Sequence, residues 1–165
     1  MSSYDINQLF QDAKDYDPDK RFMAANDLCA ELLKENSDLD TSIEKKICST
    51  FLEMLDDANI DVQGNAVRCI KLIASKINEG QVAEVASKLG DCIISGKEEF
   101  RDIYTTCLQG FISDSSDNYW KIICDTLLPL LKRGLTQGTA QEESVDILTD
   151  LLRRFGQELH GQDHS

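Results

Sequence analysis

The chain has little basic charge. Only 17 of its 165 residues are Lys or Arg, against 30 Asp or Glu, which gives a formal net charge of −13 at pH 7. Nucleic-acid phosphates and anionic membrane surfaces both recruit basic patches. The composition therefore predicts a protein that binds neither nucleic acid nor a membrane. The acidic residues favour either a solvated surface or electrostatic steering of a basic partner.

Long apolar runs and export signals are also missing. The longest apolar stretch, around Thr126–Leu131, is too short and too interrupted to cross a bilayer. Residues 1–10 lack the basic and apolar regions of a signal peptide. None of the six cysteines forms a Cys-x-x-Cys pair, and the closest two are 15 residues apart. We therefore expect free thiols in apolar helix positions and a reduced cytoplasmic or nuclear location.

Catalytic and metal-binding motifs are absent from the sequence. There is no glycine-rich phosphate loop, nucleophile elbow or His-Glu-x-x-His helix. The only histidines are His160 and His164, so a nucleophilic cysteine in the body of the chain has no neighbouring base. These two histidines could chelate a metal only on a helix, whereas their polar surroundings predict a flexible tail. We predict no enzyme activity, no cofactor and no metal.

A repeated apolar stripe is what the chain does contain. Leu28, Ile70, Leu108 and Leu148 are separated by 42, 38 and 40 positions, and each belongs to a triplet of residues four positions apart. Such triplets lie on one face of a helix. A period near 40 residues with two helices per unit is typical of HEAT or armadillo repeats. Since strand signals are weak, the sequence predicts an all-α solenoid of about four HEAT-like antiparallel helix pairs.

Capping signals place the helices within one predicted HEAT-repeat domain at residues 1–156, followed by a polar flexible tail at 157–165. Asp17 before Pro18 predicts a helix start, and Pro129 is expected to kink its helix. Three capping boxes are predicted, pairing Thr41 with Glu44, Ser95 with Glu98, and Thr139 with Glu142. The expected repeats cover 4–36, 41–78, 80–113 and 116–156, with helices at 4–15, 18–36, 42–57, 60–78, 80–95, 97–113, 116–133 and 140–156.

One segment is more specific than a generic repeat. The run from Asp19 to Leu28, with its Arg-Phe-Met-Ala-x-Asn-Asp-Leu core followed by Glu31-Leu32, resembles the first HEAT repeat of the cullin-associated, neddylation-dissociated family. The resemblance covers roughly residues 4–156. Further matching segments follow in order: Leu55-Asp56-Asp57, Asp61-Val62-Gln63, Ala66-Val67, Cys69, Lys88-Leu89, Ser95-Gly96-Lys97-Glu98 and Arg101-Asp102-Ile103.

This resemblance implies a non-catalytic protein-interaction module. Members of the family are long HEAT solenoids that wrap around a cullin and its RING subunit. Their amino-terminal repeats lie against the cullin carboxy-terminal region and the RING protein, and they cover the lysine that receives the ubiquitin-like modifier. The expected function is to hinder cullin neddylation and so regulate cullin–RING ubiquitin ligase assembly. With about four repeats where a full member has more than twenty, the chain is not expected to exchange substrate receptors alone.

Two alternatives stay open on the sequence. The chain could be a generic HEAT-repeat adaptor for another complex, or half of a split protein that acts only with a carboxy-terminal HEAT-repeat chain. The last predicted helix bears on the second alternative, because its apolar residues cover more than one narrow stripe. We expect some of them to be exposed and to support self-association or docking of another segment. These residues are Val145, Ile147, Leu148, Leu151, Leu152 and Phe155.

Partner contacts in HEAT proteins usually come from the second helix of each pair and from the turn within the pair. The residues two positions before each stripe residue, together with the turn residues, give a set of candidates. The same residue types also cap helices and pair between repeats, so a purely structural role is the competing interpretation. The candidates are Asp17, Asp19, Arg21, Asn26, Asp61, Arg68, Arg101, Thr106 and Asp146.

Overall fold

The computed structural model describes residues 3–34 and 39–162, and every regular element in these ranges is a helix. The chain divides into two compact units, Met1–Ile77 and Asn78–Ser165. Each unit consists of two helix pairs. This confirms the predicted fold class, an all-α solenoid of about four helix pairs.

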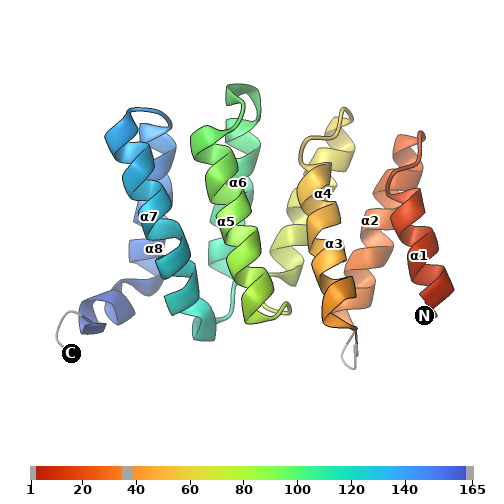
Figure 1. Cartoon of the computed structure of the whole chain (residues 1–165), viewed down its shortest axis with the longest axis horizontal. Coiled ribbons are helices and arrows are strands. Elements are labelled where there is room, and N and C mark those ends of the chain that lie inside the picture. The colour runs from red at the N-terminus through yellow and green to blue at the C-terminus, as the bar shows by residue number, and fades with distance from the viewer. Residues whose placement is uncertain (1–2, 35–38, 163–165) are drawn as a thin grey trace. The chain divides into compact units, whose positions relative to one another are not determined.

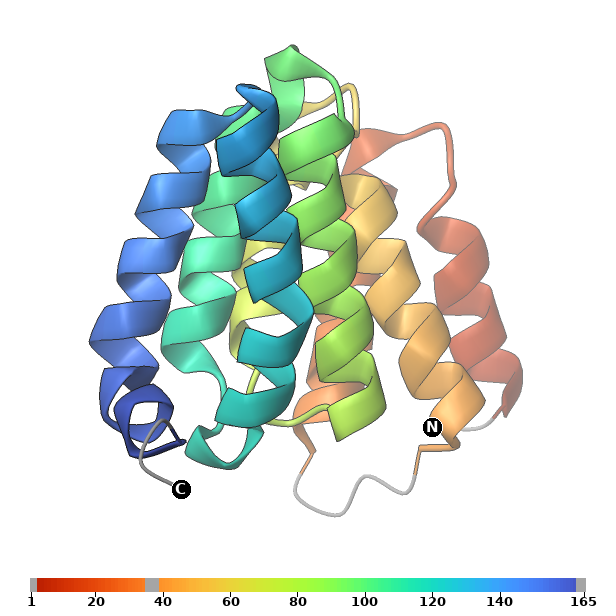
Figure 2. The ribbon, with the colours of Figure 1, turned by 60° about the vertical axis from the view of Figure 1, so that its left-hand side comes forward.

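The first unit stacks two antiparallel pairs (Figures 1 and 2). Its helices are α1 (Ser3–Asp12), α2 (Pro18–Leu33), α3 (Thr41–Met54) and α4 (Ile60–Ile73). α1 packs on α2 and α3 packs on α4, while α2 lies along α4 and joins the two pairs.

The second unit repeats this arrangement with longer helices. Its α-helices are α5 (Glu79–Ser95), α6 (Arg101–Asp114), α7 (Trp120–Gln137) and α8 (Gln141–Gln162). The 3-10 turns η1 (Glu98–Phe100) and η2 (Asp117–Tyr119) precede α6 and α7. α5 packs on α6 and α7 on α8, while α5 lies along α7 and α6 along α8.

Only one of the predicted helix starts has the predicted cap. The Asp17 carboxylate accepts a hydrogen bond from the N–H of Asp19, with Pro18 at the first helical position. α3 is capped by Asp40, whose carboxylate accepts from the N–H of Ser42, so the Thr41 box is wrong.

The other two capping boxes also fail. Ser95 ends α5, and the 3-10 turn at Glu98–Phe100 leads directly into α6 without a side-chain cap. Thr139 stands two residues before α8, which begins at Gln141, whereas a capping residue immediately precedes its helix. α7 runs through Pro129. The predicted last helix ends at 156, whereas α8 continues to Gln162; His164 lies outside the described residues.

Three of the four predicted stripe positions are in the core. Leu28, Ile70 and Leu108 are at most 1% exposed. The fourth position is wrong by one residue, since Leu148 is half-buried and Ile147 is fully buried instead. The buried stripe of α8 runs from Ser144 through Ile147 to Leu151 and Phe155, a spacing of three and four residues that follows the helix period.

The cysteines behave as core residues. All six are free thiols, five of them buried and Cys92 half-buried. Burial raises the pKa of the Cys124 thiol to about 11, so this group stays protonated at neutral pH. The expectation of free thiols within apolar helix positions is confirmed.

Candidate partner-binding face

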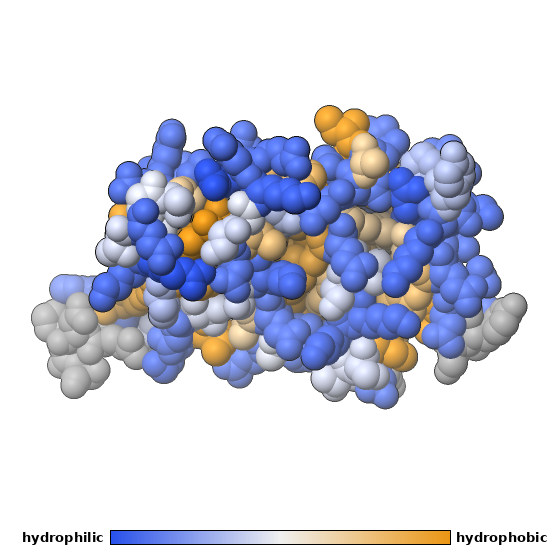
Figure 3. Space-filling model, turned by 45° about the horizontal axis from the view of Figure 1, so that its top comes forward, coloured by the Kyte–Doolittle hydropathy of each residue, from blue (hydrophilic) through white to orange (hydrophobic). Residues whose placement is uncertain are grey.

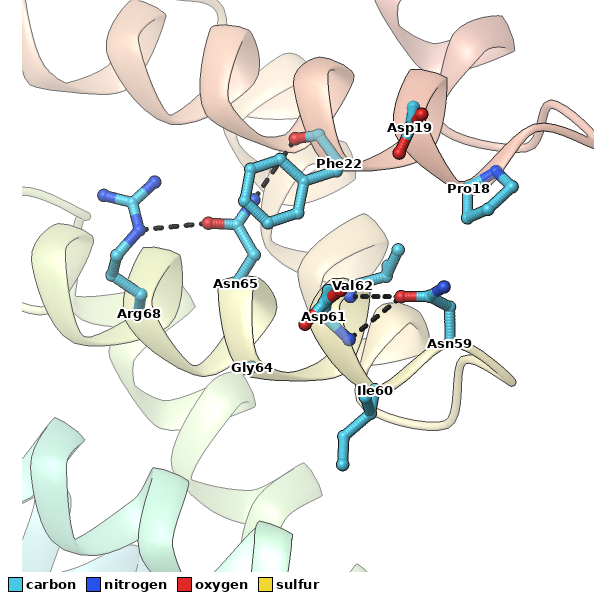
Figure 4. Close-up of a pocket in the computed structure, with 10 residues that line it drawn as sticks. All are labelled: Pro18, Asp19, Phe22, Asn59, Ile60, Asp61, Val62, Gly64, Asn65 and Arg68. Atoms are coloured by element: carbon cyan, nitrogen blue, oxygen red, sulfur yellow. Dashed lines mark hydrogen bonds between the residues drawn. The ribbon is translucent and has the colours of Figure 1, made fainter.

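The first unit has a groove between α2 and α4 (Figure 4). Its volume is about 600 Å³. One side comes from the start of α2 and the other from the first two turns of α4 and the turn before it. The lining residues are Pro18, Asp19, Phe22, Asn59, Ile60, Asp61, Val62, Gly64, Asn65 and Arg68.

Asn59 fixes the α4 side of the groove. Its side-chain oxygen accepts hydrogen bonds from the N–H groups of Asp61, at 2.9 Å, and Val62, at 3.1 Å. This cap satisfies two of the donors that a helix leaves open at its start. It also places Ile60, the first helical residue, at the groove edge with 79% of its surface exposed.

A chain of polar contacts crosses from α4 to α2. Buried Asn65 donates to the carbonyl oxygen of Phe22 at 3.2 Å, and its own oxygen accepts from Nε of Arg68 at 3.0 Å. Nη2 of Arg68 donates to the side-chain oxygen of Asn26 on α2. These contacts hold the guanidinium at the inner end of the groove, where its planar donors are oriented by two amides.

The outer end of the groove is acidic. Asp19 and Asp61 are exposed and stand in the first turns of α2 and α4. Among the residues that the structure describes, neither carboxylate has a hydrogen-bond or ion-pair partner. The groove thus combines two unpaired carboxylates, one oriented guanidinium and the apolar side chains of Phe22 and Ile60.

Comparison with known proteins identifies the origin of these repeats. The chain is 35% identical over 165 residues to Cullin-associated NEDD8-dissociated protein 1 of Drosophila melanogaster. It is 32% identical over 152 residues to the Arabidopsis thaliana protein of that name, and 32% over 159 residues to Cullin-associated NEDD8-dissociated protein 2 of Mus musculus. These matches span 90–95% of the chain. The chain resembles the cullin-associated NEDD8-dissociated proteins over nearly its whole length.

The chain spans only 12–13% of the length of these three relatives. The predicted resemblance to this family is confirmed. No protein-family model matches the chain. Two crystal structures of engineered proteins align to 92% and 91% of it, with TM-scores of 0.49 and 0.48 and 21% sequence identity.

The structure brings several of the predicted contact residues together. Asp19, Asp61 and Arg68 line the groove, and Asn26 contacts Arg68 next to it. The segments that carry the resemblance to the cullin-associated family supply residues of both walls, since Asp19 and Phe22 belong to the first segment and Asp61-Val62 to a later one. Asp17 lies just before the groove as the exposed cap of α2.

Two of the predicted contact residues are engaged inside the fold. Arg21 donates from Nε and Nη2 to the two carboxylate oxygens of Asp57, at 2.9 and 2.8 Å, and from Nη1 to the carbonyl oxygens of Asp15 and Tyr16, both at 2.9 Å. Hydrogen bonding to Asp57 raises the pKa of Arg21. Arg101 donates to the carbonyl oxygen of Ile93 at 3.1 Å, near the end of α5.

The last two candidates belong to the second unit. Thr106 on α6 and Asp146 on α8 are both exposed, and neither lines the groove. Seven groove residues were not among the candidates: Pro18, Phe22, Asn59, Ile60, Val62, Gly64 and Asn65. Ile60 had a readable signal, since an apolar residue directly after an Asn cap stands on the first turn of a helix, where few neighbours cover it.

Other kinds of site find no support in the described part of the chain. Residues 3–34 and 39–162 contain no group of three or more His, Cys, Asp or Glu side chains that could hold a metal ion. Their helices include none that is long and apolar enough to cross a membrane. On the face drawn in Figure 3, hydrophilic side chains cover most of the surface, and hydrophobic atoms show between them.

Proposed function

We propose that this chain is a non-catalytic module that binds the carboxy-terminal region of a cullin together with its RING subunit. The observation that carries this proposal is its 32–35% identity, over 90–95% of its length, to proteins named for cullin association. Bound there, the module hinders attachment of the ubiquitin-like modifier by covering the acceptor lysine. It thereby regulates the assembly of cullin–RING ubiquitin ligases in the cytoplasm, the nucleus or both.

The charge of the chain supports a basic partner surface. Residues 1–57 contain 14 Asp and Glu against 6 Lys and Arg. Complementary charge speeds encounter between two proteins and orients them, and the effect falls with rising salt. A basic cullin surface is therefore expected to bind this chain faster at low ionic strength.

A binding and conjugation experiment tests the proposal. The purified chain is titrated with an unmodified cullin–RING complex and, separately, with the same complex carrying the modifier. We expect binding to the unmodified complex, much weaker binding to the modified one, and slower modifier conjugation in a reconstituted reaction when the chain is present. A folded, helical chain that binds neither complex contradicts the proposal.

The exposed face of α8 favours a second, compatible role. Val145 and Leu152 are 50% and 54% exposed, and half-buried Leu148 lies between them on the same helix face. This agrees with the expectation that part of the last helix is uncovered. We propose that another HEAT-type helix pair packs here, either from a carboxy-terminal HEAT-repeat chain or from a second copy of this chain.

Sedimentation equilibrium separates these two sources. A mass that rises with concentration, and that returns to the monomer value in Val145→Ser/Leu152→Ser, identifies self-association. A monomer that gains mass only when a carboxy-terminal HEAT-repeat chain is added identifies the other source. No change in either mixture contradicts this second role.

A further inference from the structure

The groove between α2 and α4 has the chemistry to select one kind of partner segment. Its ends differ in charge, with Asp19 and Asp61 at the start of the two helices and Arg68 two turns further along α4. Phe22 lies between these ends and is half-buried, and Ile60 is exposed at the rim. Figure 4 shows the Phe22 ring over Asn65, between the acidic end and Arg68.

The two carboxylates at the acidic end of the groove have no partner among the described residues. Other aspartates of the first unit are used internally, since Asp57 binds Arg21 and Asp40 caps α3. Asp19 and Asp61 have no such partner among the described residues, although each is near a helix N-terminus. A helix N-terminus carries about half a positive charge. Two full negative charges therefore exceed what the two helix ends offset, and a cation is favoured between them.

The inner end is closed to a second cation. Arg68 is held by the amides of Asn65 and Asn26, so its positive charge has a fixed position. Like charges placed close together in an interface weaken binding. A bound segment is thus oriented, with its basic residue toward Asp19 and Asp61 and its apolar residue toward Phe22 and Ile60.

We infer that the α2–α4 groove binds an extended peptide segment of the partner in which a lysine or arginine neighbours a large apolar residue. The ammonium or guanidinium group lies between the carboxylates of Asp19 and Asp61, and the apolar side chain packs on Phe22, with Ile60 at the rim. This inference rests on the proposed function for the identity of the partner protein. It adds the position of the contact and the chemistry of the segment.

Gly64 allows the groove to be filled without disturbing the fold. This residue lines the groove, and a Cβ atom added to it meets nothing within 4 Å. Leucine is also a better helix former than glycine. Gly64→Leu is therefore expected to raise the melting temperature and to lower the affinity for the unmodified cullin–RING complex by more than about tenfold, as loss of a central contact does. Gly156→Leu in α8, where an added Cβ is equally free, is the matched control and keeps the affinity.

The acidic end is tested by removing charge at constant shape. Asp19→Asn/Asp61→Asn is expected to weaken binding by about tenfold and to flatten its salt dependence. The control Asp102→Asn/Glu142→Gln removes the same charge from the first turns of α6 and α8. Equal losses in both double variants would mean general attraction by the acidic surface and would overturn the inference.

A peptide probe separates failure of the groove from failure of the proposed function. The full chain, labelled with nitrogen-15, is titrated with the capped peptide Leu-Lys-Leu and with Leu-Glu-Leu at millimolar concentrations. The lysine peptide should shift the amide signals of Asp61, Gly64 and Asn65, and the glutamate peptide should not. Shifts that are absent, or equal for both peptides, overturn the inference whatever the cullin result. A cullin complex that fails to bind, with the lysine peptide still selective, overturns only the proposed function.

Discussion

The two units build the same kind of helix pair with different internal contacts. In the first unit, α2 and α4 are joined by polar side chains, and Arg21 ties α2 to the turn after α3 through Asp57. In the second unit, helices approach at glycines. A Cβ added to Gly134 of α7 would stand 2.3 Å from Oγ of Ser144 on α8, and one added to Gly90 of α5 would stand 2.8 Å from Leu130 of α7.

The two units also differ in the space left beside their helices. Asn65 of α4 bonds the carbonyl oxygen of Phe22 on α2, and the groove lies beside this contact. Close packing at Gly134 and Gly90 leaves no room for an added methyl group between the helices of the second unit. The second unit also has a recess, between α6 and α8, but its volume of about 240 Å³ is smaller than the 600 Å³ of the α2–α4 groove.

The largest effect is expected from breaking the Arg21–Asp57 pair. Asp57→Ala leaves the guanidinium without its carboxylate in a setting where the two side chains are only 17% and 11% exposed. Removing one partner of a buried ion pair costs about 3 kcal/mol or more. Urea unfolding of the full chain measures this loss. Asp125→Ala, which breaks the exposed pair with Lys121, is the control and should change stability by less than about 1 kcal/mol. Equal effects in the two variants would contradict the importance of the buried pair.

A smaller loss is expected from filling the close contact in the second unit. Gly134→Ala places a methyl group against Ser144 and Ile94. Overpacking of this kind costs about 1–3 kcal/mol, which outweighs the gain of up to about 1 kcal/mol from replacing a helical glycine. Thermal unfolding should therefore show a lower midpoint, and a raised midpoint would show that α7 and α8 can separate without cost.

The same substitution in the first unit should have the opposite sign. Gly64→Ala adds a methyl group where nothing lies within 4 Å, so only the helix propensity changes. The expected result is stabilisation by about 0.8–1 kcal/mol. Measured beside Gly134→Ala in the same unfolding assay, it tests the contrast between the open and the packed glycine. Destabilisation by Gly64→Ala would mean that the groove is closed in solution.

The smallest effect on stability is expected from lowering the pH. Burial raises the pKa of Asp57, but hydrogen bonds from Arg21 and from the N–H of Asn59 lower it to below its usual value of 3.8. The stabilisation from this carboxylate is therefore complete above the unfolded-state pKa and is lost as the pH falls through the lower folded-state pKa. The stability difference between the wild type and Asp57→Asn should shrink over that acidic range and stay constant between pH 6 and 8. A difference that instead grows as the pH falls would contradict the lowered pKa.

The sequence predicted the repeats more accurately than the contacts. The stripe through Leu28, Ile70 and Leu108 is a local helix property, and burial follows from it. The predicted stripe is wrong at Leu148, because the side of α8 that is buried depends on the close approach of Ser144 to Gly134. The spacing of apolar residues does not encode that contact.

The candidate site was predicted in part for a similar reason. Projection from the stripe found Asn26 and Arg68, which do lie together, because both occupy equivalent positions on stacked helices. It could not distinguish Arg21, which is used inside the fold, from an exposed arginine, since that depends on Asp57 arriving from a distant turn. The groove itself is formed by two segments about 40 residues apart, and only their packing brings Phe22 next to Asn65.

Radical footprinting of the full chain with the unmodified cullin–RING complex shows which face of the chain is covered on binding. We expect oxidation of Phe22 and Ile60 in the groove to fall on complex formation, while oxidation of Val145 and Leu152 on α8 is unchanged. Protection confined to α8, with Phe22 and Ile60 as reactive as in the free chain, would contradict this expectation.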